Sequence, residues 1–257
     1  MLNLEYIKSS YPPLLHGHLK DIFREYLQYK ILDYIFSCPE SKKICFIWWT
    51  ALRIWYNNQR FSEDLDFDNW WLNQKEFEKI ANIVKKWLEK EWYEVELRFI
   101  YKWAFHCEIK IPKILYDNKL SNMYTEKVMI KIDTVSQWFK YNVKKMLLEK
   151  FEVSTVISIA DLSQLLSFKI NAFLSRCKWR DIFDLCFILA NTKRPDRSIL
   201  KKLDIYKPIE LKNIMLDRIK NISLVDMQKD VRYFVFNEND VRVLKFWEII
   251  KQINFEE

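Results

Sequence analysis

Glycine is nearly missing from this chain, which has 1 Gly and 11 Trp in 257 residues. Ordinary usage of about 7% would give roughly 18 Gly. A mixed fold with so little glycine has few ways to make turns that need a positive φ. Tryptophan stands where such turns are expected, for example at Trp92, between a predicted helix and strand, and at Trp103, between two predicted strands.

Other absences exclude whole classes of protein. The 5 cysteines are scattered and odd in number, which excludes a disulfide framework and favours a reducing, cytoplasmic compartment. The 3 histidines cannot build a zinc site with those cysteines at a familiar spacing. No run of about 18 apolar residues exists, so we expect no membrane span. The N-terminus also lacks a signal-peptide pattern.

The composition that remains is that of a globular protein with a basic balance. Half of the residues are hydrophobic, enough for one large or two small domains with a real core. The net charge of +7 suits a polyanionic partner such as RNA. A lysine-rich composition gives the same balance with no functional reason, so charge alone decides nothing.

The most informative stretch runs from residue 44 to residue 68. A short apolar run predicts a buried strand, a short helix follows, and alternating apolar and acidic residues predict a second strand, over residues 44–47, 50–56 and 60–67. The two-residue period of a strand puts Asp64 and Asp66 on one face. Two carboxylates side by side at a strand end can hold a divalent metal and, through it, a triphosphate. The alternative is an exposed strand edge with solvated acids.

Two parts of this stretch resemble a known family. Thr50-Ala51-Leu52-Arg53 and the run from Arg60 to Phe67 match, residue for residue, the AbiEii-type abortive-infection toxins of the nucleotidyltransferase superfamily. The departure is Trp48-Trp49, which stands where that family has Gly-Gly. Glycines there let backbone N–H groups approach a phosphate, whereas two indoles would fill the space.

We therefore hypothesise that the tryptophans reflect translation with the wrong codon table. Some bacterial lineages read UGA as glycine and others as tryptophan, so the native protein would carry Gly at most or all of these positions. The alternative is that the tryptophans are genuine and the protein has lost catalysis. The codons in the coding DNA decide between the two.

The resemblance also implies a set of site residues. Asp64 and Asp66 would hold two Mg²⁺ ions, with a third carboxylate from a later strand. Asp133, in the alternating run 128–135, is the candidate for binding the second metal or accepting a proton, and Glu108 is its competitor. The nucleotide, an NTP, would contact Trp48, Trp49, Thr50, Arg53, Arg60 and Ser62.

A second signature lies further along the chain. Lys169 on a predicted helix, followed by Arg180-Asp181 and Asp184-Leu185 at the start of the next, resembles the family's second motif. The resemblance implies that Lys169 contacts the triphosphate and that Asp181 or Asp184 orders the acceptor side. The structural alternative is an ion-paired joint between two helices.

Together these features predict an α+β fold with a nucleotidyltransferase-type mixed sheet, flanking helices and a helical C-terminal half. We expect an N-terminal helical segment, a nucleotidyltransferase core and a helical C-terminal domain, over residues 1–40, 41–140 and 141–257. The family implies a phage-defence toxin that transfers NMP from NTP to an RNA, plausibly a tRNA, and is neutralised by an antitoxin. A small-molecule acceptor such as an aminoglycoside, a catalytically dead binding module and a core-only relative without a nucleotide site remain alternatives.

Overall fold

The computed structural model describes residues 3–137, 141, 143–231, 234–237 and 239–256. The chain divides into two compact units. Unit 1 comprises Met1–Ala51, Phe61–Trp138 and Lys144–Ile159, and unit 2 comprises Leu52–Arg60, Phe139–Val143 and Ala160–Glu257.

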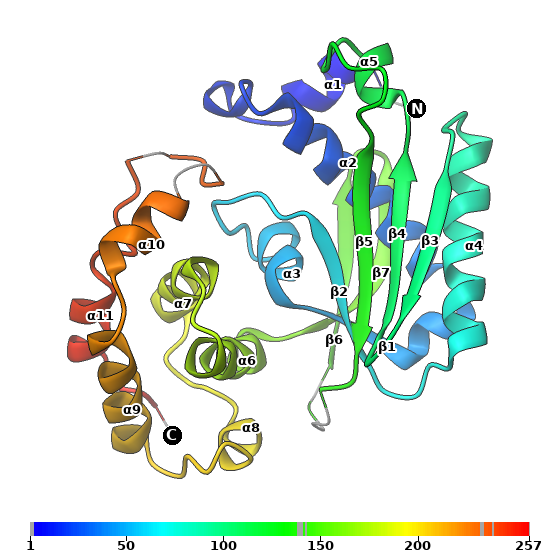
Figure 1. Ribbon diagram of the computed structural model, residues 1–257. Coiled ribbons are helices and arrows are strands. Elements are labelled where there is room, and N and C mark those ends of the chain that lie inside the picture. The colour runs from blue at the N-terminus through cyan, green and yellow to red at the C-terminus, as the bar shows by residue number, and fades with distance from the viewer. Residues whose placement is uncertain (1–2, 138–140, 142, 232–233, 238, 257) are drawn as a thin grey trace. The chain divides into compact units, whose positions relative to one another are not determined.

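Unit 1 is built on a seven-stranded mixed sheet in the order β3-β4-β5-β2-β1-β7-β6 (Figure 1). The strands are β1 (Ile44–Ile47), β2 (Asp64–Asn69), β3 (Glu96–Tyr101), β4 (Phe105–Ile111), β5 (Val128–Val135), β6 (Val143–Lys150) and β7 (Val153–Ala160). At the centre β2 is parallel to β5 and antiparallel to β1, while β1 is parallel to β7. This mixed sheet with flanking helices confirms the predicted α+β class.

The helices of unit 1 are α1 (Leu4–Ser9), α2 (Leu19–Phe36), α4 (Gln74–Lys90) and α5 (Ile114–Asp117), with short 3₁₀ turns at Pro13–Leu15 and Pro39–Lys43. Of these, α2 and α4 pack on one face of the sheet. Phe36 of α2 lies 6.2 Å from Phe67 of β2, and Phe77 of α4 lies 5.7 Å from Phe105 of β4, between ring centroids. Because side chains alternate along a strand, the acidic residues of β2 take the opposite face.

Strand β5 has the boundaries of the alternating run 128–135, and helix α4 is a capped amphipathic helix. Asn73 caps α4, because its side chain accepts the Glu76 N–H at 3.1 Å while the Glu76 carboxylate accepts the Asn73 N–H at 3.1 Å. The apolar face of α4 is buried on the sheet, as its three- and four-residue spacing predicts.

The chain after residue 140 differs from the expectation of helices. β6 and β7 form a hairpin through Phe151 and Glu152, which have φ of 54° and 62°. A two-residue hairpin turn with positive φ at both central residues usually carries Asn or Gly there. Phe and Glu occupy these positions here, so the sequence gives no signal of the turn. β7 then joins the sheet beside β1, with Phe46 opposite Ile159. Residues 138–140, at the expected domain boundary, lie outside the described residues.

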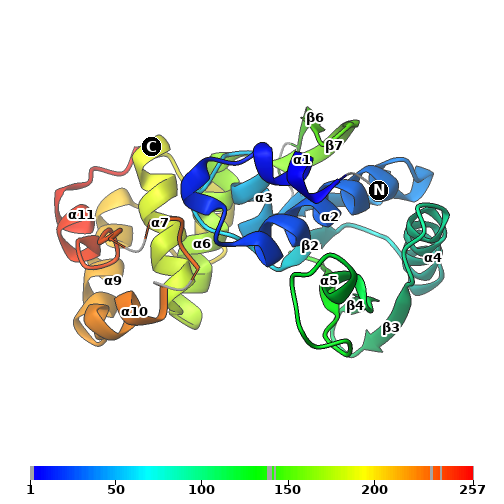
Figure 2. The same ribbon diagram turned by 90° about the horizontal axis from the view of Figure 1, so that it is seen from above.

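Unit 2 is helical (Figures 1 and 2). Its helices are α6 (Leu162–Ser175), α7 (Trp179–Asn191), α8 (Arg197–Lys201), α9 (Pro208–Lys220), α10 (Leu224–Val231) and α11 (Phe246–Gln252), and α3 (Trp48–Ile54) begins in unit 1 and ends in unit 2. α6 packs on α7, and Phe173 of α6 meets Phe246 of α11 edge-on at 5.4 Å. Within the described part of the chain, no helix has the length and apolar character needed to cross a membrane.

Candidate active site

The junction between β1 and α3 has the backbone form that glycine favours. α3 begins directly after Ile47, and Trp48 has a φ of 63°, in the left-handed region. That conformation costs a residue with a side chain roughly 1–2 kcal/mol. Trp49 is buried and stacks on Trp48, with ring centroids 5.6 Å apart. The predicted phosphate loop is therefore a strand–turn–helix junction whose space is filled by two indoles.

Thr50 fastens this junction to the start of β2. Its hydroxyl donates to the carbonyl oxygen of Asp64 and lies 2.7 Å from the hydroxyl of Ser62. Gln28 of α2 donates to the Ser62 carbonyl at 2.9 Å. Thr50 is fully buried, so its hydroxyl is engaged inside the protein, whereas the sequence predicts that it contacts a phosphate. These contacts place residues 48–50 beside Asp64.

Three carboxylates share the sheet face that α2 and α4 leave uncovered. Asp64 and Asp66 of β2 are partly exposed, and Asp66 is the register partner of Asp133 on the neighbouring parallel strand β5. Register partners on adjacent strands point to the same side of a sheet. We call Asp64, Asp66 and Asp133 the acidic face.

A lysine and a histidine hold Asp133 in place. Lys131, the register partner of Asp64, lies 3.2 Å from one Asp133 oxygen, and His106 Nδ1 lies 2.7 Å from the other. Burial alone would lower the pKa of Lys131, but Asp133, Asp64 and Asp66 outweigh it and raise that pKa. The three carboxylates therefore act together on one cation position.

Glu108, the competing candidate, lies one strand further out on β4. Its register partner is Lys131, so β5 separates it from the two aspartates of β2. Lys110 lies 2.8 Å and Arg98 lies 3.5 Å from its carboxylate, and the hydrogen bond from Lys110 lowers its pKa. This geometry favours Asp133 as the third carboxylate.

The acidic face fits a magnesium ion that arrives with its nucleotide. Among the described residues, no group of three or more His, Cys, Asp or Glu side chains lies close enough together to hold a metal ion alone. Mg²⁺ is usually bound by one or two carboxylates, with waters and substrate phosphates completing its octahedron. The acidic face supplies hard oxygen ligands of this kind, and the raised pKa of Lys131 reflects their stabilisation of a positive charge.

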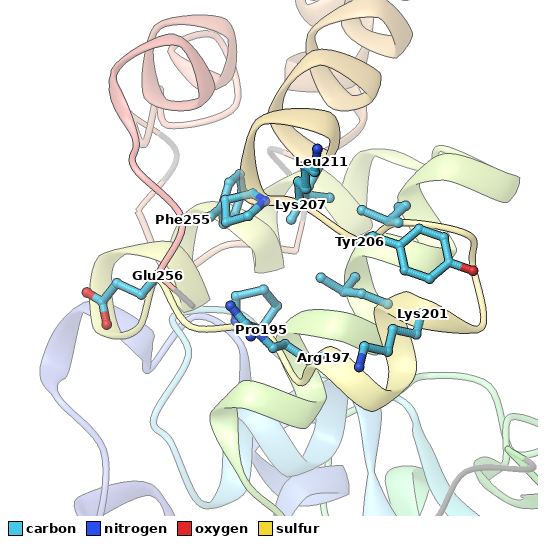
Figure 3. A pocket seen from close by; sticks show the side chains of 11 residues that line it. Pro195, Arg197, Lys201, Tyr206, Lys207, Leu211, Phe255 and Glu256 are labelled. Atoms are coloured by element: carbon cyan, nitrogen blue, oxygen red, sulfur yellow. The ribbon is translucent and has the colours of Figure 1, made fainter.

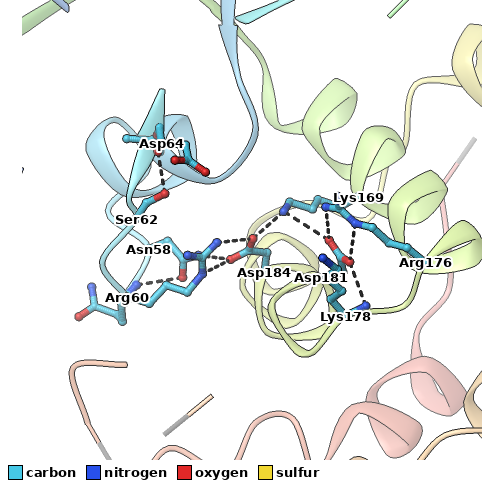
Figure 4. Close-up of polar contacts among 11 residues, drawn as sticks. Asn58, Arg60, Ser62, Asp64, Lys169, Arg176, Lys178, Asp181 and Asp184 are labelled. Atoms are coloured by element: carbon cyan, nitrogen blue, oxygen red, sulfur yellow. Dashed lines mark hydrogen bonds and ion pairs between the residues drawn. The ribbon is translucent and has the colours of Figure 1, made fainter. Parts of the chain in front are cut away.

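The second signature folds into a buried cluster of charges within unit 2 (Figure 4). Lys169 of α6 lies 2.7 Å from Asp184 of α7, and both side chains are 0% exposed. Arg60 pairs with the same carboxylate through two hydrogen bonds of 2.9 and 2.8 Å. On the other side Arg176 lies 3.1 Å from Asp181, which is also 0% exposed. We call Arg60, Lys169, Arg176, Asp181 and Asp184 the buried charge network.

Burial and pairing oppose each other in this network. Burial raises the pKa of Asp184, but Arg60 and Lys169 more than offset it, so that pKa lies below its usual value. Burial lowers the pKa of Lys169 to about 8, against the pull of Asp184 and Asp181. Asn58 donates to Asp184 at 2.7 Å and completes its shell. The arrangement is the ion-paired helix joint that the sequence left as an alternative for Asp181 and Asp184.

Arg53 is also engaged within unit 2. It is 7% exposed and donates to the Asn57 side chain at 3.0 Å and to the Asn58 carbonyl at 3.2 Å. Its guanidinium lies 4.5 Å from the ring centroid of Phe236. Like Arg60, Arg53 therefore has partners in its own unit, whereas the resemblance assigns both arginines to a triphosphate.

The predicted site residues thus fall into two groups. Unit 1 brings together Trp48, Trp49, Thr50, Ser62 and the acidic face. Unit 2 brings together Arg60, Lys169 and Asp181. Sequence reasoning missed His106 and Asn58. His106 could be found only through the pairing of β4 with β5, and Asn58 only through a contact to a residue far along the chain.

Comparison with known proteins agrees with the signatures. Residues 50–248 match the family model described as the nucleotidyl transferase AbiEii toxin of type IV toxin–antitoxin systems. This chain belongs to the AbiEii family. It is a nucleotidyltransferase of the toxin type, and the family's description implies an antitoxin partner.

Solved structures share the AbiEii fold at low identity. JHP933 from Helicobacter pylori matches with a TM-score of 0.58 and 17% identity over 90% of each chain. MenT4, a nucleotidyltransferase toxin from Mycobacterium tuberculosis, matches with a TM-score of 0.56 and 10% identity over 98% of this chain and 91% of that one. No curated protein matches the sequence.

Proposed function

We propose that this AbiEii protein transfers a nucleotide from an NTP to a hydroxyl of an RNA such as a tRNA, with two Mg²⁺ ions held on the acidic face. The observation that carries the proposal is the register of β2 and β5, which puts Asp66 beside Asp133 on the partly exposed sheet face opposite α2 and α4. Bound there, Mg²⁺ would stabilise negative charge on the attacking and leaving oxygens.

The chain's own residues would divide the remaining tasks. His106 and Lys131 fix both oxygens of Asp133, so this carboxylate is held ready to accept the acceptor hydroxyl's proton. Lys131 supplies positive charge beside the place where phosphate oxygens would lie. Thr50 fastens the first turn of α3, residues 48–50, to Asp64, which keeps this backbone beside the carboxylates.

The loop works in this scheme only if its backbone is bare, so we also propose that the native residues at most or all of the tryptophan positions are glycine, encoded by UGA. Trp48 and Trp92 have φ of 63° and 70°, in the region that glycine favours. Trp92 and Trp103 are 96% and 98% exposed, so their indoles add almost nothing to the core. Sequencing the codons, or mass spectrometry of the peptide spanning residues 44–53 from the source organism, tests this; TGG codons would overturn it.

The family resemblance suggests RNA as the acceptor, and the distribution of charge between the two units supports it. Unit 1 carries 21 Lys and Arg against 21 Asp and Glu, and unit 2 carries 21 against 14. The whole net charge of +7 therefore falls on unit 2, which suits a polyanionic acceptor. This distribution favours RNA over a cationic aminoglycoside.

The test uses the chain with Trp48→Gly and Trp49→Gly, because two indoles would block the loop. It is incubated with Mg²⁺, each α-labelled NTP in turn and total RNA. We expect label in RNA, and none when Asp64→Ala and Asp66→Ala are added. Label on a small molecule alone would show that the acceptor is a small molecule. No turnover with any acceptor would show that the protein is a binding module without catalysis.

A further inference from the structure

A small pocket lies in unit 2, far along the sequence from every residue of the acidic face. The turn between α8 and α9 and the segment that follows α11 form its walls (Figure 3). Its lining residues are Pro195, Arg197, Leu200, Lys201, Ile205, Tyr206, Lys207, Pro208, Leu211, Phe255 and Glu256. No residue of either family signature lines it, so the function proposed above does not use it.

The floor of the pocket is apolar and fixed in position. Leu200, Ile205, Leu211 and Phe255 are all less than a tenth exposed. Backbone and side-chain hydrogen bonds anchor the segment that carries Phe255: Glu256 N–H donates to the Lys193 carbonyl at 2.9 Å, and Lys212 donates to the Ile253 carbonyl at 2.9 Å. The pocket is therefore built into the fold and needs no rearrangement to receive a group.

The rim is cationic. Arg197, Lys201 and Lys207 line the opening and are exposed, with Glu256 the one acid among the lining residues. Tyr206, 63% exposed, adds an aromatic edge. An occupant that places an apolar group on the floor therefore meets positive charge on its flanks, and carboxylates there would be attracted.

The size of the pocket selects the class of occupant. It holds about 40 Å³ of space, whereas ligand and cofactor sites are typically several hundred Å³. One water needs about 10–15 Å³ on this scale, so the pocket has room for roughly three such groups. That suits the end of a branched aliphatic side chain and is too small for a nucleobase.

We propose that this pocket binds a protein segment in which a leucine, isoleucine or valine is flanked by acidic residues. The aliphatic side chain is the anchor and the cationic rim pairs with its acidic neighbours, which is the usual division between the core and rim of a protein interface. The net positive charge of unit 2 adds attraction at longer range.

The test is a titration of methyl-labelled protein with the peptide acetyl-Asp-Glu-Leu-Glu-Asp-amide, followed by NMR. We expect the methyl signal of Ile205 to shift, with a Kd of about 1 mM or tighter. A peptide with Ser in place of Leu, and one with Asn and Gln in place of the acids, should each bind at least about tenfold more weakly. No shift of Ile205 with the first peptide, or equal shifts with all three, would overturn the proposal.

A pair of charge-matched variants checks the rim. Lys201→Glu with Lys207→Glu should abolish the shift, while Lys220→Glu with Lys229→Glu, at the far end of α9 and on α10, should keep it. Lys220 and Lys229 are 61% and 69% exposed in their side chains, so both pairs change the net charge equally and neither disturbs the core. Loss in both pairs would mean that only net charge matters. A shift of Ile205 with octauridylate and none with the peptide would assign the pocket to RNA instead.

Discussion

The two units use carboxylates in opposite ways. The acidic face of unit 1 lies on the side of the sheet opposite α2 and α4, is partly exposed, and raises the pKa of Lys131 with all three carboxylates. The buried charge network of unit 2 surrounds two carboxylates with three cations and hides its lysine and both aspartates completely. Partly exposed carboxylates on one sheet face can take up a metal, whereas fully buried carboxylates paired with cations hold two helices together. Both sets come from family signatures, so a signature alone does not separate chemistry from architecture.

The largest expected effect falls on activity and comes from the acidic face. Asp64→Ala with Asp66→Ala, in the chain with Gly at positions 48 and 49, should lower nucleotide transfer at least about a thousandfold, or roughly 4 kcal/mol. The melting temperature should stay nearly unchanged, because partly exposed ion pairs contribute little to stability. Transfer assays and thermal unfolding of the same preparation measure both. A large drop in melting temperature would give this face a structural role and break the comparison.

The buried charge network should give the reverse pattern. Asp184→Ala strands Arg60 and Lys169 without their shared carboxylate and should lower the free energy of unfolding by about 3–5 kcal/mol. Asp217→Ala, at a side chain that is 76% exposed, is the control and should change it by less than about 0.5 kcal/mol. Urea unfolding measures both. Equal small effects would show that the network is not a structural joint.

The pH dependence of the unfolding free energy tests whether the buried Lys169 has a lowered pKa. The pKa of Lys169 is about 8 in the folded chain and 10.5 in its ordinary state, so between these values the unfolded chain binds more protons at this lysine. Stability from this group therefore rises with pH from about 8 to about 10.5 and is constant below. Lys169→Met removes the effect, so the unfolding free energy of the original chain should grow relative to that of the variant across this window. A flat difference would mean that the lysine stays charged.

The smallest effect concerns backbone strain in unit 1. Trp92 follows the end of α4 with φ of 70° and is 96% exposed, so Trp92→Gly should raise the free energy of unfolding by about 1 kcal/mol. Trp87→Gly, in the interior of the same helix, is the matched control and should lower it by about the same amount. Destabilisation by Trp92→Gly would show that the indole contributes to the fold and would weaken the glycine hypothesis.

The features of the fold and the site that depend on neighbouring residues could be predicted from the sequence, whereas those that depend on contacts between distant residues could not. The two-residue period of a strand put Asp64 and Asp66 on one face, because that signal depends only on neighbouring residues. The hairpin at Phe151-Glu152 was missed because its left-handed turn lacks the residues that usually mark one.

Long-range pairing explains the remaining differences in the site. His106 reaches Asp133 only because β4 pairs with β5, and Arg60 reaches Asp184 across more than a hundred residues. A family resemblance identifies which residues belong to a motif, but the burial of each side chain decides whether it can contact a substrate. Lys169 shows this, since its side chain is fully enclosed.

The most direct test of the central claim measures metal binding on the acidic face. Electron paramagnetic resonance with Mn²⁺ and a non-hydrolysable NTP analogue counts bound metal in the chain with Gly at positions 48 and 49, with and without Asp66→Asn. We predict that Mn²⁺ binds only together with the nucleotide, and that Asp66→Asn removes this binding while the melting temperature stays the same. Equal Mn²⁺ binding in the two proteins would contradict the assignment of the acidic face.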